Sequence, residues 1–405
     1  MSKAFIANSG IITAIGDDFG LNNYSLKNLN HGITISSILQ TTHQLPVGEV
    51  KMSNAYLAER ANLRFEVFNR KPQKLTKFPR TALLSLMAAQ EAWLQLERKS
   101  KGLKIGFISA NTVGGMDLTE RFYTAFLKDK TSGNIDDIRN HESGAITELV
   151  HDALGLNGWD TTISTACSSS ANSIMMAARM IEHGHYDVVI AGGADSLSKF
   201  TLNGFNSLMI LDKDLCKPFD QNRKGLNLGE GAAYIVLANE KAVEQFKITP
   251  LAFVSGYANA NDAHHQTASS PEGKGNRLAM MKALEVAQLS TQQIDYINLH
   301  GTGTANNDSS EGNAIQDLFM NKVPVSSSTK GYTGHTLGAS GAVEAVFSLM
   351  SIKDQIAWPN LRFENRIEGL NWSPITELFP KKIEHVLSNS FGFGGNCSTL
   401  VISKV

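Results

Sequence analysis

The stretch TTISTACSSSANSIMMAARMIE, residues 161–182, joins a strand-like segment to an apolar helix through a turn of small side chains around Cys167. Threonine and isoleucine at its start favour a strand. Residues 171–182 are apolar on most sides of a helix, so we expect this helix to be buried. A strand that leads directly into a buried helix is typical of α/β proteins.

The same alternation recurs along the chain. Runs rich in valine, isoleucine and tyrosine with few charges predict strands that are covered on both faces. Such strands are expected at residues 104–109, 186–190, 232–237, 294–299, 323–326 and 399–403. Helices are expected at residues 80–99, 171–182, 277–289 and 342–353. This alternation predicts an α/β fold with mostly parallel or mixed sheets.

A weak internal similarity links two of the expected strands. GEGAAYIVL, residues 229–237, and GGNCSTLVI, residues 394–402, both run from glycines through small residues into a β-branched strand. Each follows an earlier set of strands and helices. The similarity indicates either a duplicated fold of two lobes, with a boundary near residues 240–250, or a chance likeness between strands.

Composition and charge restrict the function classes. Hydrophobic residues make up 42% of the 405 residues and charged residues 19%, and this low charge favours a large core or a subunit interface. A net charge of -1 does not favour bulk electrostatic binding of nucleic acid. No apolar run is long enough to predict a membrane span, and the first residues lack the pattern of a secretory signal. Three cysteines without a CxxC pattern favour a reducing compartment, so we expect a cytoplasmic protein.

Cys167 is the first candidate for chemistry. Its place at a strand-to-helix turn predicts a lowered thiol pKa, because the helix dipole and free N–H groups favour the thiolate. The small residues around it leave room for a substrate. The alternative is a buried, inert cysteine, and this is our interpretation of Cys216 and Cys397.

His300 and His335 differ from the other histidines because both lie in Gly/Thr loops that follow expected strands. Open α/β sheets place ligands at the carboxyl ends of strands, although a loop histidine can also simply bind a backbone carbonyl. Their spacing predicts no metal site, since no carboxylate or second histidine lies at ligand spacing. The glycine loop NSFGFGG, residues 389–395, is not a dinucleotide motif. Its N–H groups either hold an oxyanion or belong to a glycine-rich turn.

Together these segments resemble the β-ketoacyl-(acyl-carrier-protein) synthases, condensing enzymes of the thiolase-like superfamily. The matching stretches are TACSSS around Cys167, GEGAA at Gly229, HGTGTANND at His300, STKGYTGHTLGASGAVEA from Ser328 and NSFGFGG at Asn389. They occur in order over residues 150–405, whereas the first hundred residues match loosely, mainly at SGIITAIG. The resemblance implies an α/β thiolase-like duplicated fold of two similar halves, residues 1–247 and 248–405, with mixed sheets sandwiched by helices.

The resemblance also implies roles for individual residues. Cys167 would carry the acyl chain as a thioester, and His300 and His335 would stabilise an enolate, as in the elongating Cys-His-His class. Lys330 and Glu344 would support these histidines as a charged pair. The backbone N–H groups of Cys167 and Phe393 would form the oxyanion hole. No resident cofactor and no metal are expected, since the substrates are carried on the 4'-phosphopantetheine of an acyl carrier protein (ACP).

Further residues are implied in substrate and carrier binding. Positions that match the pantetheine channel, the gate and the acyl pocket are Thr302, Thr304, Phe391, Phe393, His265, Phe205 and Leu337. Residues 59–80 hold seven basic and two acidic side chains, so their net charge is +5. Arg70, Lys71, Lys74 and Lys77 are the expected docking residues for the acidic carrier, although an ordinary solvated stretch is the alternative. Met209 stands where fatty-acid elongation enzymes of this kind often have arginine, so docking could differ.

The predicted function is the decarboxylative Claisen condensation of an acyl chain on Cys167 with malonyl-ACP to give 3-oxoacyl-ACP. The pathway is either fatty-acid synthesis or a type II polyketide or polyene system. A homodimer or a heterodimer with a related ketosynthase-like subunit is expected, without nucleic acid and without membrane insertion. The main alternative is a non-catalytic, chain-length-factor-like subunit, but such subunits lack the nucleophile. A Cys–His hydrolase would have no use for two glycine-flanked histidines.

Overall fold

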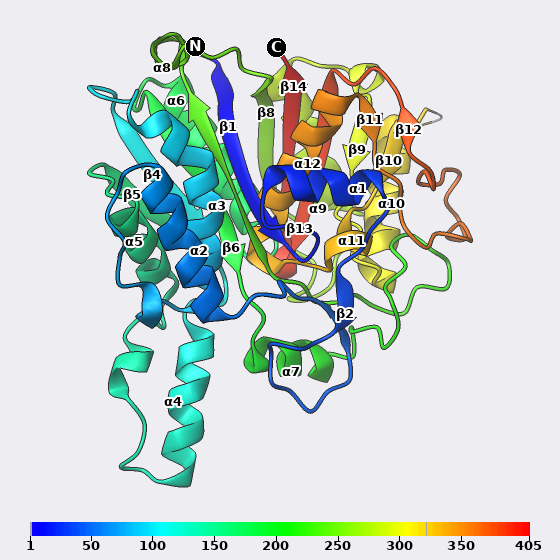
Figure 1. The fold of residues 1–405 in the computed structure, drawn as a ribbon. Coiled ribbons are helices and arrows are strands. Elements are labelled where there is room, and N and C mark those ends of the chain that lie inside the picture. Colours follow the sequence, from blue (N-terminus) through cyan, green and yellow to red (C-terminus); the bar gives the residue numbers. More distant parts are fainter. Residues whose placement is uncertain (1, 321) are drawn as a thin grey trace.

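A mixed sheet of ten strands runs through the described part of the chain, residues 2–320 and 322–405 of a computed structural model (Figure 1). Its strands follow the order β10-β9-β13-β14-β8-β1-β7-β6-β4-β5. Their bounds are β1 Ala4–Thr13, β4 Ile105–Ala110, β5 Trp159–Ile163, β6 Val188–Asp195, β7 Gly231–Ala238, β8 Ala252–Asn261, β9 Tyr296–Asn298, β10 Val325–Ser327, β13 His385–Gly392 and β14 Asn396–Lys404. Two short pairs stand apart from this sheet: β2 Ile33–Ile35 with β3 Pro46–Gly48, and β11 Ile356–Ala357 with β12 Phe379–Pro380.

The sheet consists of two halves with the same topology. In the first half β1, β7 and β6 are antiparallel neighbours, and β6, β4 and β5 are parallel ones. In the second half β8, β14 and β13 are antiparallel, and β13, β9 and β10 are parallel. The strands β7 and β14, which carry the similar sequences, hold equivalent places. The predicted fold of two similar halves is therefore confirmed, whereas the boundary between residues 247 and 248 stays a prediction.

Helices cover both faces of this sheet (Figure 1). Their bounds are α1 Phe19–Lys27, α2 Asn54–Val67, α3 Arg80–Glu97, α4 Met116–Lys128, α5 Ser143–Ala153, α6 Ser169–Glu182, α7 Lys199–Ser207, α8 Glu240–Phe246, α9 Lys274–Ala287, α10 Ala305–Phe319, α11 Lys330–Thr333 and α12 Ser340–Asp354. All four helices expected from the sequence are present, as α3, α6, α9 and α12. The side chains of β7 pack against helices on both sides of the sheet. Tyr234 and Val236 belong to the hydrophobic cluster that includes α3, whereas Ile235 and Leu237 belong to the cluster that includes α6 and α12. Alternate side chains of a strand point to opposite faces, so β7 is covered on both.

Three strands of the ten-stranded sheet were not expected from the sequence, namely β1, β8 and β13, and neither were the short pairs β2–β3 and β11–β12. The segment AFVSGYANAN of β8 contains glycine, alanine and asparagine, which have little strand propensity. It forms a strand because β1 and β14 pair with it on both sides. The contact between β1 and β8 also joins the two halves, through the pairs Ala4–Val254, Phe5–Phe253 and Ile6–Ala252.

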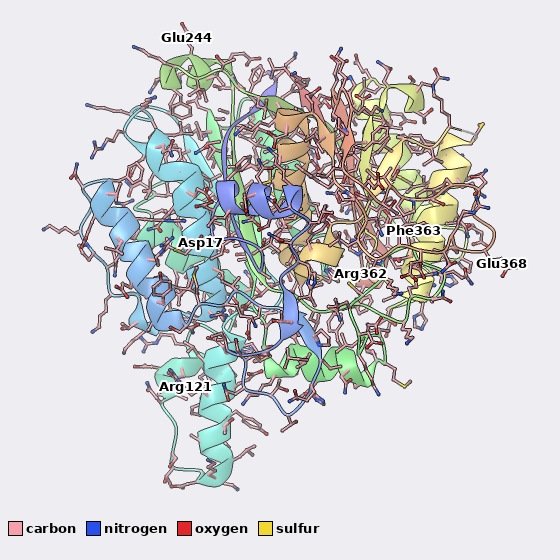
Figure 2. The ribbon with its side chains drawn as sticks, turned by 45° about the vertical axis from the view of Figure 1, so that its right-hand side comes forward. Asp17, Arg121, Glu244, Arg362, Phe363 and Glu368 are labelled. Carbon is pink, nitrogen blue, oxygen red and sulfur yellow. The ribbon has the colours of Figure 1, made fainter. Side chains whose placement is uncertain are left out.

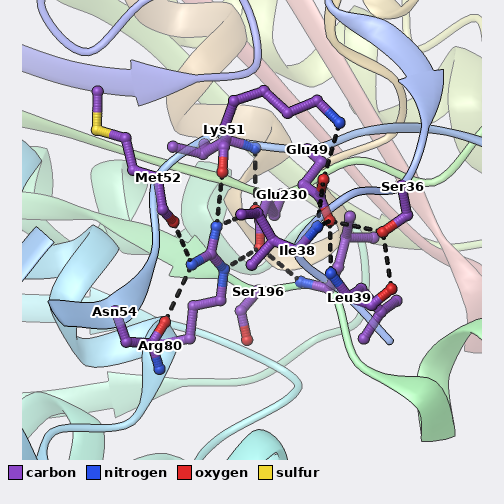
Figure 3. A network of polar contacts seen from close by, with 12 residues as sticks. Ser36, Ile38, Leu39, Glu49, Lys51, Met52, Asn54, Arg80, Ser196 and Glu230 are labelled. Carbon is purple, nitrogen blue, oxygen red and sulfur yellow. Dashed lines mark hydrogen bonds and ion pairs between the residues drawn. The ribbon is translucent and has the colours of Figure 1, made fainter. Parts of the chain in front are cut away.

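A buried ion pair joins the start of α3 to the start of β7 (Figure 3). Arg80 donates from Nε and Nη2 to the two carboxylate oxygens of Glu230, at 2.8 and 2.6 Å. Glu230 also accepts the N–H groups of Val50 and Leu197, each at 3.0 Å. Arg80 also donates to the carbonyl of Met52 at 2.8 Å. The pair thus holds four separate segments together next to the loop that supports the site described below.

The helix α4 extends away from the sheet and its covering helices, at the lower left of Figure 1, and Figure 2 shows Arg121 on it. Leu118 is its one buried residue, whereas Tyr123 is 56% and Leu127 67% exposed. Within the described residues, no helix is both long and apolar enough to span a membrane.

Candidate active site

Cys167 lies in the turn between β5 and α6, as the sequence predicts. Ala166 has a left-handed backbone with φ of 52°, which turns the chain sharply into the helix. The small polar residues hold this turn, since Ser169 donates to the Ala166 carbonyl at 2.6 Å and accepts the Thr165 N–H at 2.8 Å. The motif TACSSS therefore closes a tight turn around a thiol that is only 7% exposed.

The predicted lowering of the Cys167 pKa is wrong for the free protein. Burial raises the pKa of this thiol to about 11, although the Lys330 charge and the N–H groups of Phe393 and of Cys167 itself favour the thiolate. Desolvation penalises the charged form of a buried group, and here it exceeds the effect of the helix start. The thiol is therefore protonated at neutral pH.

Alkylation of Cys167 by iodoacetamide should accelerate with pH. Only the thiolate reacts, and with a pKa of about 11 its fraction rises about tenfold for each pH unit between pH 7 and 9. Mass spectrometry of the labelled peptide over this range measures the rate, with free glutathione as the reference thiol. A rate that levels off below pH 8 would contradict the raised pKa.

His335 faces the sulfur directly. Its Nε2 lies 3.1 Å from Cys167 Sγ, and its Nδ1 lies 2.9 Å from the hydroxyl of Ser340. Its backbone N–H donates to the Asn227 carbonyl at 2.8 Å, and its carbonyl accepts the Gly229 N–H at 2.8 Å. The segment before β7 thus fixes the backbone of His335. Gly229, the first residue of the GEGAA stretch, takes part in this contact.

His300 follows β9 and lies beside His335, with ring centroids 5.3 Å apart and ring planes at 86°. Glu311 on α10 accepts the N–H groups of His300 at 2.9 Å and of Gly301 at 2.8 Å. The Nζ of Lys330 donates to the His300 carbonyl at 2.6 Å and lies 3.3 Å from its Nδ1. An ammonium beside Nδ1 favours the neutral form of His300 that carries its ring proton on Nε2.

Both imidazoles are neutral at physiological pH. Burial lowers the pKa of His300 and of His335 well below the ordinary value, and the Lys330 charge adds to this. Lys330 forms a buried ion pair with Glu344 on α12. Burial also raises the pKa of Glu344, and the Lys330 ammonium opposes that rise. The two histidines are therefore suited to donate hydrogen bonds from neutral rings.

The helix α11, which carries Lys330, is held from outside by an arginine. Arg362, labelled in Figure 2, donates to the carbonyls of Gly331 at 2.6 Å and Cys216 at 2.8 Å. Cys216 itself is buried with its thiol 3.8 Å from the Lys330 carbonyl, and Cys397 is buried beside Asn276. Both cysteines thus lie in the core, as interpreted from the sequence.

Two cavities meet at Cys167. The first, of about 310 Å³, is lined by both histidines and by Thr302, Thr304 and Phe391. The second, of about 410 Å³, is mostly apolar and includes Leu337. Cys167, Phe205 and Phe393 line both cavities. The rings of Phe205 and Phe393 stack with centroids 5.8 Å apart, so Phe393 lies where a gate between the cavities would be.

The glycine loop, residues 389–395, can approach the Cys167 turn closely because Gly392 has no side chain. A Cβ on Gly392 would lie 3.0 Å from the Cys167 nitrogen, so a side chain there would displace the turn. His265, in contrast, is exposed and lies outside the residues that line either cavity. Its Nδ1 accepts the Thr267 N–H at 3.2 Å. The structure therefore does not bring His265 to the other candidate residues.

The expected basic patch is smaller than its net charge indicates. Arg60 pairs with Asp17 at 2.6 Å, Arg64 donates to the carbonyl of Met87, and Arg70 donates to the carbonyl of Leu154 at 2.7 Å. Arg80 is buried in the ion pair described above. Lys71, Lys74 and Lys77 are exposed, and Lys77 lies 3.7 Å from Asp136. Four of the seven charges thus hold the fold together, and three lysines remain on the surface.

Two buried carboxylates that position the site were not found from the sequence. Glu311 holds the His300 loop, and Asp195 at the end of β6 accepts the N–H groups of Thr112, Val113 and Gly338 at 2.8, 2.9 and 2.7 Å. Glu311 lies three residues after Asp308, and both carboxylates accept backbone N–H groups of the loop that follows His300. This spacing on one helix face was an available signal for Glu311, whereas Asp195 had none.

Comparison with known proteins agrees with this geometry. A family profile described as the beta-ketoacyl synthase N-terminal domain matches residues 35–242, and one described as the C-terminal domain matches residues 251–364. The chain is 36% identical over 341 residues to 3-oxoacyl-[acyl-carrier-protein] synthase 2 of Coxiella burnetii, covering 79% of this chain and 81% of that protein.

Solved structures show the same fold. A chain of the ishigamide ketosynthase/chain length factor superposes with a TM-score of 0.93 at 24% identity, over 100% of this chain and 99% of that chain. A chain of the ketosynthase ApeO in complex with its chain length factor ApeC, from Xenorhabdus doucetiae, gives a TM-score of 0.86 at 30% identity, over 100% and 98%. The duplicated sheet with its central cysteine is thus the fold of thiolase-like ketosynthases. The chain belongs to the β-ketoacyl synthase family, which confirms the resemblance seen in the sequence.

Proposed function

We propose that this protein condenses an acyl chain, held as a thioester on Cys167, with malonyl-ACP to form 3-oxoacyl-ACP and carbon dioxide. The observation that carries the proposal is the 3.1 Å contact of His335 Nε2 with Cys167 Sγ, beside the neutral ring of His300. A nucleophile and two neutral N–H donors at the meeting point of two cavities suit this reaction. The names of the relatives support the substrate class.

Acyl transfer is the first half of the reaction. The sulfur of Cys167 attacks the carbonyl of the incoming thioester, and the thiol proton passes to the leaving pantetheine sulfur. Charge develops on the carbonyl oxygen, and the N–H groups of Cys167 and Phe393 would receive it. The apolar second cavity, with Phe205 and Leu337, would then hold the acyl chain.

Condensation is the second half. The malonyl thioester loses carbon dioxide, and the electron pair of the broken bond forms an enolate. The Nε2–H groups of His300 and His335 would hold the enolate oxygen. Its carbon then attacks the acyl thioester and releases the Cys167 sulfur. Lys330 supports this step by keeping the His300 proton on Nε2, and Thr302 and Thr304 would bind the pantetheine arm in the first cavity.

The test of the proposal is product formation. Purified protein is given malonyl-ACP and a panel of acyl-ACP substrates of different length, and the carrier-bound product is weighed by mass spectrometry. We expect a 3-oxoacyl product two carbons longer than the starter. No extended product with any starter, alone or with a related subunit, would contradict the proposal.

Carrier docking is proposed for the three exposed lysines, Lys71, Lys74 and Lys77, whereas Arg70 is engaged by the Leu154 carbonyl and by Glu97. Reversing charge in the double variant Lys71→Glu/Lys74→Glu should raise KM for acyl-ACP about threefold to tenfold, because acidic carriers are attracted by basic surfaces. KM for an acyl-pantetheine should stay unchanged. Lys101→Glu, another exposed lysine, is the matched control. An equal change with both substrates would remove the docking proposal.

A non-catalytic chain-length-factor role is not favoured by the site, because such a role would need neither the thiol nor the paired histidines. We propose that the protein acts as the catalytic member of a homodimer or of a ketosynthase heterodimer. The solved complex of the ketosynthase ApeO with its chain length factor ApeC, which contains a chain similar to this one, supports such a pairing. The pathway, fatty-acid or polyketide and polyene synthesis, and the cytoplasm as compartment remain parts of this proposal.

A further inference from the structure

The three reacting side chains also form a set of soft metal ligands. Cys167, His300 and His335 each offer one ligand atom, and these atoms all lie within 4.8 Å of one another. Zinc binds thiolate sulfur at about 2.3 Å and imidazole nitrogen at about 2.0 Å, which puts neighbouring ligand atoms roughly 3.5 Å apart in a tetrahedral site. Small rotations of the three side chains would bring their atoms to these separations.

We propose that the unacylated protein binds one thiophilic divalent cation, with Zn²⁺ as the type ion, through Cys167 Sγ and the Nε2 atoms of His300 and His335. Cysteine and histidine are the usual zinc ligands, and catalytic zinc sites have three protein ligands with a water in the fourth position. The first cavity opens onto these three atoms and supplies room for that water. The spacing of the residues along the chain does not predict this site, because each ligand comes from a different segment.

Some neighbours of the three ligand residues favour metal binding, and others weaken it. Ser340 orients the His335 ring through Nδ1, so that Nε2 is turned toward the Cys167 sulfur, as second-shell partners of zinc ligands do. The Lys330 charge beside His300 is balanced by Glu344. Metal on Nε2 of His300 puts the ring proton on Nδ1, which then meets the Lys330 ammonium. Lys330 keeps its two other acceptors, but it loses the contact with Nδ1 and repels the new Nδ1–H, and both effects weaken the binding of the ion.

Binding exchanges a proton for the metal. The S–H bond of Cys167 breaks, an S–Zn bond forms, and one proton goes to the buffer without any change of oxidation state. A sulfur bound to zinc cannot accept an acyl chain, and an acylated sulfur cannot bind zinc. Zinc and acyl substrate therefore exclude each other, and this consequence alone rests on the proposed condensation.

The direct test measures metal rather than turnover. The purified full-length protein is dialysed against Zn²⁺ at neutral pH, and bound zinc is counted per chain. We expect one chelator-removable ion in the unmodified protein and in the matched controls Cys216→Ser and Cys397→Ser. In Cys167→Ser and in protein alkylated with iodoacetamide, we expect zinc to fall at least tenfold. Circular dichroism checks that each variant is folded.

Cobalt gives a second signal, which partial unfolding of a variant would not mimic. Co²⁺ bound through Cys167 should show a sulfur-to-cobalt charge-transfer band, which disappears in Cys167→Ser and weakens in His300→Ala and His335→Ala. Zinc binding that is equal in the wild type and in folded Cys167→Ser would overturn the proposal, as would its absence from both. These readouts need no condensation activity, so a failure of the proposed function would leave the metal site standing.

Discussion

Replacing Cys167 with alanine is expected to lower chain extension by on the order of 10⁴-fold or more, because the variant has no atom to carry the acyl group. The neighbouring groups stay in place, since alanine fills the turn without strain and His335 keeps its contacts with Ser340 and Asn227. Decarboxylation of malonyl-ACP should therefore persist. Release of carbon dioxide and formation of 3-oxoacyl product are measured in the same assay.

The matched control for this prediction is Cys216→Ala, which removes another buried thiol of the same chain. It should retain chain extension within a few fold. Unimpaired extension by Cys167→Ala would refute the nucleophile assignment, and the proposed function would then need another acyl carrier. A loss in both variants would indicate damage to the core instead of to the chemistry.

Replacing His300 with alanine is expected to lower condensation by about 10²–10³-fold, the cost of removing one preorganised donor to an oxyanion. Transfer of an acyl chain onto Cys167 should continue, because the proposed oxyanion hole for that step consists of the N–H groups of Cys167 and Phe393 and not of His300. The effect thus separates the two halves of the reaction. Acylation is measured from the mass of the intact protein, and condensation from the extended product.

His265→Ala is the control for this second prediction, since His265 is exposed and outside both cavities. It should leave both half-reactions unchanged. Loss of acylation in His300→Ala, together with loss of condensation, would mean that this ring does not act on the enolate alone. Such a result would transfer part of the acyl-transfer role to His300.

Much of the fold was predictable because its elements are locally encoded. The helix α6 is apolar on most sides, and β7 is an uncharged segment with tyrosine, isoleucine and valine at its centre, and both form where expected. The strand β8 was not predicted, because its glycine, alanine and asparagine carry no strand signal. It depends on pairing with β1 and β14, which lie far away in the sequence.

The candidate site, like the fold, was predicted from the sequence only in part. Cys167, His300 and His335 were predicted from motifs, and the structure brings their side chains together. The arginines from Arg60 to Arg80 were counted as surface charge, but Arg80 pairs with Glu230, a residue 150 positions away. No local pattern distinguishes a surface arginine from one whose partner comes from a distant strand.

By itself the sequence determined the alternation of strands and helices, the family and the identity of the reacting groups, because propensity and motif are properties of short segments. Only the tertiary structure decided that the Cys167 thiol is protonated, that the histidines are neutral, and that the ligand atoms of these three distant side chains lie within 4.8 Å of one another. Desolvation and the distances between atoms arise when remote segments pack against one another, and no short segment contains them.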